Sequence, residues 1–302
     1  MIKKFEFSLL FKRANIFSFI LCFVAIGFIM FKGLNYGIDF KGGTLIELRT
    51  ENKNISISDL RTSFSNLEVG DVSVKEFGKK GDYLIKIEQK TNTNNNIIPN
   101  IKKNIAQYLQ TEVNFRRVEN VGPKVSSELL QSGLIAIALS LAAMLFYIWI
   151  RFEWQFSIGS IVALFHDVII TVGIFSILSF EINLSIIAAV LTIVGYSMND
   201  TVVIYDRIRE NLLKYNKLNI EQISNLSINE TLSRTIITSV TTLLALLSIF
   251  ILGGEILRGF SFAMILGVVI GTYSSIFVAA PILKYFKVSY KTMEKDEETI
   301  VP

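Results

Sequence analysis

The chain has almost none of the residues that build disulfide bonds or transition-metal sites. It contains one cysteine, Cys22, and one histidine, His166, among 302 residues, so no disulfide can close within it. One thiol and one imidazole also argue against a structural metal cage, which takes four sulfur or nitrogen ligands. We therefore expect neither a metal nor another cofactor.

The first apolar run lacks the cleavage site of a secretory signal peptide. Basic residues precede the run as they would in a signal peptide, namely Lys3, Lys4, Lys12 and Arg13. No small-x-small pattern follows it, however, because the chain continues as Phe31-Lys32-Gly33-Leu34. We expect this run to remain in the protein as a membrane anchor.

Apolar residues are abundant and lie in blocks. They make up 51% of the chain, and the mean hydropathy is +0.48. A helix that crosses the hydrocarbon core of a bilayer needs about 20 mostly apolar residues. The sequence thus predicts an α-helical membrane protein with six transmembrane helices. The six segments are 15–30, 133–150, 156–179, 184–204, 236–252 and 260–283.

Basic residues are scarce on one side of these spans, which predicts their orientation. In the short loops 180–183 and 253–259, Arg258 is the single basic residue. Lys and Arg gather at the N-terminus, at Arg151, in the loop after the fourth span and in the C-terminal tail. Because cytoplasmic loops are rich in Lys and Arg, we expect both termini in the cytoplasm. The net charge of +4 is mostly this signal and does not argue for nucleic-acid binding.

The segment between the first two spans, residues 36–123, is polar and is expected on the outer side of the membrane. Alternating residues predict strands, and helical spacing after Ser58 predicts a helix with Ser58 as its N-cap. The elements follow the β-α-β-β-α-β order of a small α+β ferredoxin-like domain. A face or edge of its sheet would stay open to a partner. The predicted strands are 44–49, 72–77, 83–88 and 112–119, and the second helix is 97–109.

The predicted organisation has six parts. After the fourth span, the cytoplasmic loop is expected to form an amphipathic helix along the membrane surface. The parts are the N-terminus with the first span (1–33), the periplasmic domain (34–125), spans two to four (126–204), the cytoplasmic loop (205–235), spans five and six (236–283) and the cytoplasmic tail (284–302).

Asp200 is a carboxylate at membrane depth, in the fourth-span sequence Gly195-Tyr196-Ser197-Met198-Asn199-Asp200. Such a charge costs about 2.5 to 3.5 kcal/mol unless it is paired or faces a polar cavity. Arg234 stands at similar depth at the inner end of the fifth span, Thr238 belongs to the hydroxyl stripe after it, and Asn199 shares a helix face with Asp200. The group predicts an ion path. A static ion pair that fixes helix packing is the alternative.

Asp167 and His166 lie near the middle of the third span. Neighbouring positions place the two side chains on different faces of a helix. Asp167 is predicted either to belong to the ion path or to hydrogen-bond a neighbouring helix as a structural link. His166 is a weaker candidate for the same path.

Five motifs, in this order along nearly the whole chain, resemble those of the SecF family. They are Gly37-Ile38-Asp39-Phe40-Lys41-Gly42-Gly43 after the first span, Val121-Gly122-Pro123 before the second, Phe165-His166-Asp167 in the third, Gly195 to Asp200 in the fourth, and Asp206-Arg207-Ile208-Arg209-Glu210-Asn211 just past it. SecF is a subunit of the bacterial protein-export complex SecDF, which is related to the resistance–nodulation–division transporters.

The resemblance implies a membrane-embedded auxiliary of the SecYEG translocon and not an enzyme. Such a subunit uses inward ion flow, usually of protons, to pull or hold a translocating preprotein on the outer side. In that family a fourth-span aspartate and a fifth-span arginine belong to the ion path, so Asp200 and Arg234 inherit those roles. Six spans make half of the twelve-span bundle of the superfamily, which implies a SecD-like partner or fusion. The outer domain would pair with the outer region of SecD.

Three other functions remain open from the sequence. Half of a small-molecule antiporter would need a larger outer domain than 36–123 provides. A non-conducting scaffold would use Asp200 and Arg234 only to join helices. An intramembrane aspartyl protease would need Asp167 and Asp200 to share a proton at about 3 Å, and no Gly-x-Gly-Asp pattern is present. A carboxylate among hydroxyls suits protons and sodium equally.

Overall fold

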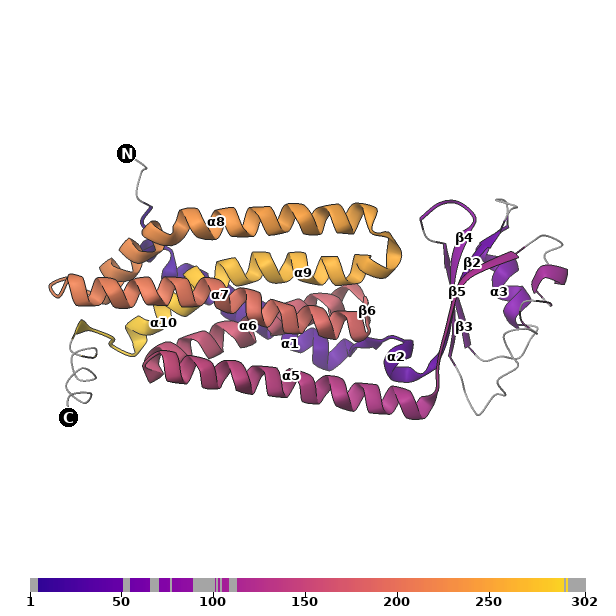
Figure 1. Cartoon of the computed structure of the whole chain (residues 1–302), viewed down its shortest axis with the longest axis horizontal. Coiled ribbons are helices and arrows are strands. Elements are labelled where there is room, and N and C mark those ends of the chain that lie inside the picture. Colours follow the sequence, from indigo (N-terminus) through magenta and orange to yellow (C-terminus); the bar gives the residue numbers. More distant parts are fainter. Residues whose placement is uncertain are drawn as a thin grey trace. The chain divides into compact units, whose positions relative to one another are not determined.

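The computed structural model describes residues 5–50, 55–65, 71–76, 78–88, 101, 103, 105–108, 113–290 and 292. The chain forms two compact units (Figure 1). The membrane unit comprises Met1–Asn35, Ala136–Phe180 and Ser185–Pro302, and the outer unit comprises Tyr36–Ile135 with Glu181–Leu184.

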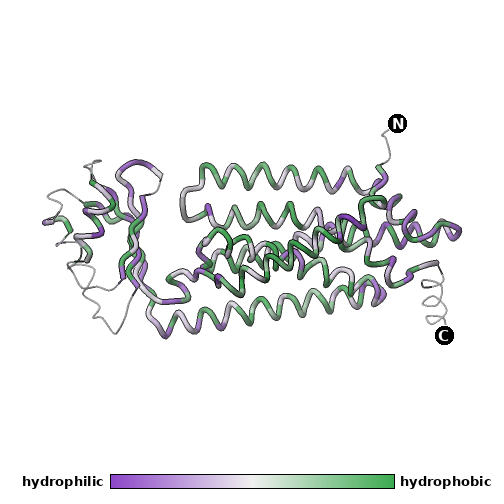
Figure 2. The backbone as a smooth tube through the Cα atoms, turned by 180° about the vertical axis from the view of Figure 1, so that it is seen from behind, coloured by the Kyte–Doolittle hydropathy of each residue, from purple (hydrophilic) through white to green (hydrophobic). Residues whose placement is uncertain are grey.

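Six helical stretches in the described part of the chain are long and apolar enough to cross a membrane, which confirms the predicted spans. Apolar residues follow these helices along their length (Figure 2). The last stretch, Leu257–Tyr285, contains α9, a π-helical turn and α10. The helices are α1 (Phe11–Lys32), α5 (Pro123–Arg151), α6 (Trp154–Leu178), α7 (Leu184–Lys214), α8 (Ile220–Leu252), α9 (Gly254–Ser274), the π-helical turn (Ser275–Ala279) and α10 (Ala280–Tyr285), after a short 3-10 helix at Phe7–Leu9.

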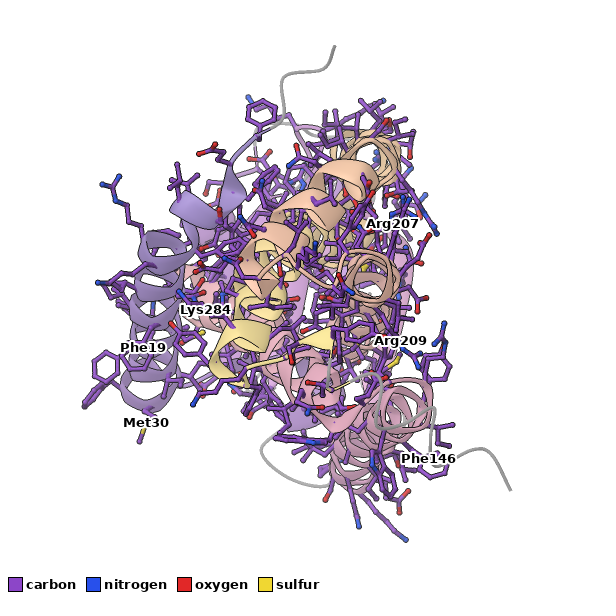
Figure 3. The ribbon with its side chains drawn as sticks, turned by 90° about the vertical axis from the view of Figure 1, so that its left-hand side faces the viewer. Phe19, Met30, Phe146, Arg207, Arg209 and Lys284 are labelled. Atoms are coloured by element: carbon purple, nitrogen blue, oxygen red, sulfur yellow. The ribbon has the colours of Figure 1, made fainter. Side chains whose placement is uncertain are left out.

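Helices α6, α7 and α9 supply most of the interior of the membrane unit. Half of the apolar stretch of α6 and of α7 is buried, against 11% in α1. Helix α1 packs along α6, and α8 packs along α9. Phe19 and Met30 on α1 and Phe146 on α5 point away from their neighbours (Figure 3), with exposed fractions of 73%, 78% and 59%. Large apolar side chains exposed on helices of this length are what lipid would cover.

The prediction of a separate surface helix over 205–235 is wrong. Helix α7 continues to Lys214 and α8 begins at Ile220, so five residues connect them. Asn219 caps α8 because its side chain accepts the backbone N–H of Gln222 at 2.9 Å, and the Gln222 side chain accepts the backbone N–H of Asn219 at 3.1 Å. Arg207 on α7 also donates to Glu230 on α8 at 2.7 Å. This contact holds together the parts of α7 and α8 that extend beyond the predicted spans.

The outer unit contains the predicted four-stranded antiparallel sheet. Its strand order is β3-β4-β2-β5, which is the ferredoxin-like order. Apolar side chains from one face of the sheet, among them Ile46 and Ile85, form a core with Leu60 and Phe64 of α3. Short strands β1 (Asn35–Tyr36) and β6 (Glu181–Ile182) form a second, two-stranded sheet. The remaining elements are α2 (Ile38–Lys41), β2 (Gly43–Thr50), α3 (Ile57–Ser65), β3 (Asp71–Glu76), β4 (Asp82–Glu88) and β5 (Val113–Val121).

Two details of the outer unit differ from the prediction or fall outside the described residues. Helix α3 begins one residue before the predicted cap, and Ser56 caps it instead of Ser58. The Oγ of Ser56 accepts the backbone N–H of Asp59 at 3.1 Å, and Asp59 Oδ2 accepts the N–H of Ser56 at 3.1 Å. Of the predicted helix 97–109, only residues 101, 103 and 105–108 are described, and these are helical.

A buried ion pair makes the stability of the outer unit depend on pH. Asp82 is 4% exposed, and the Arg49 guanidinium donates to both of its oxygens at 2.5 Å. These hydrogen bonds hold the pKa of Asp82 below its ordinary value. A carboxylate with a lowered folded-state pKa stabilises the fold above its unfolded pKa, about 3.9, and this contribution is lost as the pH falls through the folded-state pKa.

We expect Asp82→Asn to melt at a lower temperature than the wild type at pH 7, because the substitution removes the charge that Arg49 binds. The gap between the two melting temperatures should narrow as the pH falls below about 4, where the carboxylate of the unfolded wild type becomes protonated, and it should close as the pH falls through the lower pKa of folded Asp82. Thermal unfolding in detergent between pH 7 and pH 3 measures this gap. A constant gap over that range would contradict the pair's role.

Candidate functional site

Asp200 is buried where three helices meet. It lies on α7 and is 3% exposed. Thr272 of α9 is within hydrogen-bonding reach of its carboxyl group, and the positive charge of Arg234 on α8 acts on it. One of its oxygens, Oδ2, has no hydrogen-bond partner among the described residues. Arg234 itself is exposed, but the fold places its charge where it acts on the buried Asp200.

Hydroxyl groups of α8 and α9 surround this carboxylate. Ser239 and Thr272 form a hydrogen bond of 2.7 Å between the helices. Thr235 is 1% exposed, and its Oγ1 has no partner in the described part of the chain. Oδ2 of Asp200 and Oγ1 of Thr235 are thus two buried oxygens without a hydrogen-bond partner among the described residues. A water molecule or a transferred proton would satisfy such atoms.

Two of the predicted path residues stand apart from this group. Thr238 donates to the backbone carbonyls of its own helix at Arg234, 3.1 Å, and Thr235, 3.0 Å. Asn199 is exposed on the surface of α7 in this chain. Ser239 belongs to the hydroxyl stripe after Arg234, but the prediction selected Thr238 from that stripe, whereas Ser239 is the hydroxyl that faces α9. Its spacing of four residues from Thr235 is the signal that could have found it, because both positions lie on one helix face.

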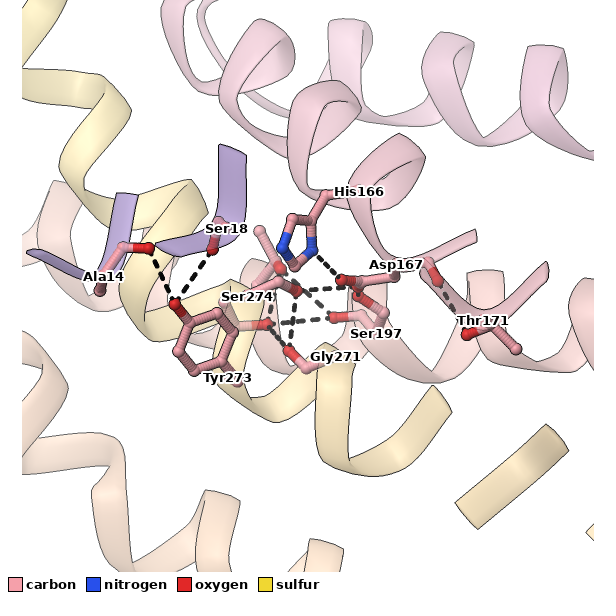
Figure 4. A network of polar contacts seen from close by, with 11 residues as sticks. Ala14, Ser18, His166, Asp167, Thr171, Ser197, Gly271, Tyr273 and Ser274 are labelled. Atoms are coloured by element: carbon pink, nitrogen blue, oxygen red, sulfur yellow. Dashed lines mark hydrogen bonds and ion pairs between the residues drawn. The ribbon is translucent and has the colours of Figure 1, made fainter. Parts of the chain in front are cut away.

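Asp167 is the centre of a second polar group (Figure 4). It is fully buried, and its Oδ2 accepts the hydroxyls of Ser197 on α7 at 2.5 Å and Ser274 on α9 at 2.8 Å. Its Oδ1 is 2.8 Å from Nδ1 of His166. The two residues were expected to place their side chains on different faces of the helix. In the structure the side chains nevertheless lean together and bond.

His166 extends this group toward α1. Its ring stacks on Tyr273, with centroids 6.2 Å apart and planes 24° from parallel. The Tyr273 hydroxyl donates to the carbonyl of Ala14 at 3.0 Å and lies 3.0 Å from the hydroxyl of Ser18. Nε2 of His166 is buried and without a partner among the residues described. Four membrane helices, α1, α6, α7 and α9, thus meet at one polar network.

One segment of α9, residues 271–275, touches both carboxylate groups. Thr272 faces Asp200, whereas Ser274 bonds Asp167. Ser275 lies 2.8 Å from the hydroxyl of Thr201, one position after Asp200 on α7. The π-helical turn begins at Ser275, and such turns within α-helices are frequent at functional sites.

Gly271 allows this close approach of α9 to α7. A Cβ atom at Gly271 would lie 2.9 Å from the Cβ of Ser197, closer than real side chains come. The absence of a side chain is therefore what lets the Ser197 hydroxyl and the α9 hydroxyls converge on Asp167.

Asp167 and Asp200 belong to separate polar groups. No hydrogen bond joins Asp167 to Asp200 within the described ranges, as a proton-sharing protease pair would require. Nor do three His, Cys, Asp or Glu side chains gather anywhere in the described part of the chain.

Comparison with known proteins identifies the family. A family model described as "Protein export membrane protein SecD/SecF, C-terminal" matches residues 101–289, and one described as "SecD/SecF GG Motif" matches residues 27–53. The chain is 44% identical to the "Protein translocase subunit SecF" of Rickettsia rickettsii (strain Sheila Smith), over 96% of both chains. It is 46% identical to the subunit of that name from Rickettsia bellii (strain OSU 85-389), over 93% of both. The chain belongs to the SecF family.

SecF relatives also include solved structures. A crystal structure of SecDF, a translocon-associated membrane protein from Thermus thermophilus, matches with a TM-score of 0.85 and 35% identity. The match covers 95% of this chain but 39% of that one. A crystal structure of SecDF in a super-membrane-facing form matches with a TM-score of 0.70 and 34% identity, over 99% of this chain and 40% of that one. This SecF chain is a multi-pass membrane subunit that spans about two fifths of SecDF.

The GG motif of the SecF family has a physical explanation here. Gly42 and Gly43 both have a positive φ, 80° and 144°, which side chains rarely tolerate. A Cβ atom at Gly43 would overlap the carbonyl oxygen of Ile87. The pair therefore turns the chain tightly from α2 into β2, against the neighbouring strand β4.

Proposed function

We propose that this chain is the SecF-like subunit that couples inward proton flow to late preprotein translocation and release through SecYEG, with a SecD-like partner. One observation carries the proposal: Asp200 is buried between α7, α8 and α9, acted on by Arg234 and Thr272, with one oxygen left unpartnered. A carboxylate kept in such a place at a cost of several kcal/mol suits a group that binds and releases a proton.

The coupling step follows from charge. When Asp200 takes up a proton, the buried negative charge disappears, and with it the electrostatic attraction to Arg234. The interaction between α7 and α8 then weakens, while Thr272 can turn its hydroxyl to Ser239. Two arrangements of α8 and α9 against α7 result, and the protonation state of Asp200 selects between them.

The remaining path residues have distinct proposed roles. Asp167 relays protons through Ser197 and Ser274, which stand between it and the helix turn of Asp200. Asn199 lines the path from the exposed face of α7, where a partner's helices would cover it. The role of Thr238 as a path residue remains a prediction.

The partner and location are also part of the proposal. The chain covers 39% of the SecDF structure, so a SecD-like subunit would supply what corresponds to the rest. The subunit would reside in the inner membrane of a bacterium with both termini in the cytoplasm, as the distribution of Lys and Arg predicts.

Preprotein export into inverted membrane vesicles tests the function. We expect vesicles that contain this chain, its SecD-like partner and SecYEG to export faster with a proton gradient than with ATP alone, because proton flow supplies the added work. Equal rates in the two conditions would favour a scaffold. Stimulation by a sodium gradient in the presence of a protonophore would assign the path to sodium instead.

A further inference from the structure

Residues 37–41 and residues 181–184 form a contact that the ion path does not use, and we call it the clasp. The first segment includes α2 and leads directly into the sheet of the outer unit. The second is the connection between α6 and α7. Both belong to the outer unit, although the connection joins two membrane helices.

The central contacts of the clasp are hydrogen bonds that involve backbone groups. Asp39 Oδ2 accepts the backbone N–H of Leu184, the first residue of α7, at 2.9 Å. The N–H of Gly37 donates to the carbonyl of Ile182 at 2.9 Å. A carboxylate at this place satisfies an N–H that the helix itself leaves free, and its charge is favourable at the positive end of the helix dipole.

Charged side chains extend the clasp onto the sheet. Glu181 forms ion pairs with Lys86 of β4 and with Lys75 of β3, the latter at 3.9 Å. Lys41, at the end of α2, pairs with Glu88 of β4 at 3.4 Å. Surface pairs such as these contribute little each, but they attach each of the two segments to the same sheet.

We propose that Asp39 is a positioning residue that ties the first turn of α7 to the outer domain, so that movement of the helix carrying Asp200 is transmitted to that domain. This inference rests on the proposed function. Asp200 lies about 24 Å further along the same unbroken helix, at 1.5 Å per residue. A helix is stiff along its axis, so a shift at Asp200 reaches Leu184. Without the Asp39 bond, the outer domain would follow that shift less closely.

We expect Asp39→Ala to lower the gradient-stimulated part of export about fivefold, the usual effect of losing one helix cap, while export with ATP alone stays at the wild-type rate. Asp39→Asn should retain most of the stimulation, because asparagine caps a helix as well as aspartate does. Asp59→Ala is the matched control: it removes a carboxylate that caps α3, a helix that packs against β3 inside the outer unit.

A reversible disulfide provides the decisive measurement. A Cβ at Gly37 would lie 3.3 Å from the Cβ of Asn183, close to the separation of about 3.5 to 4.5 Å in disulfides. In a Cys22→Ser background, Gly37→Cys with Asn183→Cys should bridge the clasp covalently. We expect oxidation of this pair to restore stimulation to Asp39→Ala, and dithiothreitol to abolish the restoration.

The outcomes separate the two proposals. Full stimulation in Asp39→Ala, an equal loss in Asp59→Ala, or no restoration on oxidation would each overturn the clasp and leave the proton path standing. If wild-type vesicles show no stimulation by the gradient, the proposed function itself has failed. Equal amounts of each variant in the membrane, measured by immunoblot, exclude loss of the protein as the cause.

Discussion

Asp200→Asn should abolish the stimulation of export by a proton gradient while export driven by ATP alone continues. Asparagine has nearly the shape of aspartate and can still accept a hydrogen bond from Thr272. Its amide, however, cannot take up or release a proton as a carboxylate does. One proton that crosses 100 mV supplies about 2.3 kcal/mol, a factor of about 50 in an equilibrium constant. We therefore expect the gradient-dependent component to fall to background in the vesicle export assay.

Asp206→Asn is the matched control for this substitution. It removes an aspartate of the same helix, six positions on, that pairs with Arg151 at 2.7 Å near the end of α7 and outside the polar group. The control should keep gradient-stimulated export at the wild-type level. Gradient-dependent secretion in Asp200→Asn, or an equal loss in Asp206→Asn, would remove Asp200 from the proton path.

The large features of the fold could be predicted because they depend on composition over many residues. Apolar blocks predicted the six spans, and alternation predicted the strands of the outer unit. The electrostatic influence of Arg234 on Asp200 could be predicted for a similar reason, since residues at similar depth on neighbouring antiparallel helices come near each other. Each of these inferences averages over a whole segment, so an error of one or two residues does not change it.

The features that could not be predicted depend on single contacts. Helix α8 begins at Ile220 because Asn219 and Gln222 cap it, a short-range signal that the polar composition of the loop obscured. The hydrogen-bond partners of Asp167 could not be predicted for another reason. A serine or threonine in an apolar helix most simply bonds its own backbone, as Thr171 does with the carbonyl of Asp167 at 2.8 Å. The sequence does not distinguish such a residue from Ser197 or Ser274.

The clasp between Asp39 and Leu184 joins positions 145 residues apart. In the sequence its first segment is a flexible glycine-rich turn, and its second is a short loop between two spans. Only the three-dimensional arrangement reveals that the carboxylate of the turn reaches the first N–H of α7.

Asp167 offers a test that separates a relay from a structural link. Asp167→Asn should leave the protein folded, because an amide can still hydrogen-bond Ser197, Ser274 and His166 in place of the carboxylate. If Asp167 relays protons, this variant should lose at least about tenfold of the gradient-stimulated export, or about 1.4 kcal/mol of coupling. The vesicle export assay and thermal unfolding in detergent measure the two effects separately.

Asp167→Ala should instead lower stability. Truncation leaves a buried imidazole and two buried hydroxyls without their acceptor, and each such group costs about 1 to 3 kcal/mol. Ser274 can fall back on the carbonyl of Gly271, which it already contacts at 3.1 Å, so we expect a total of about 3 kcal/mol and a melting temperature several degrees below that of Asp167→Asn. If Asp167→Asn instead exports with full stimulation and only Asp167→Ala is impaired, Asp167 joins α6 to α7 and α9 without carrying protons, and the path consists of the Asp200 group alone.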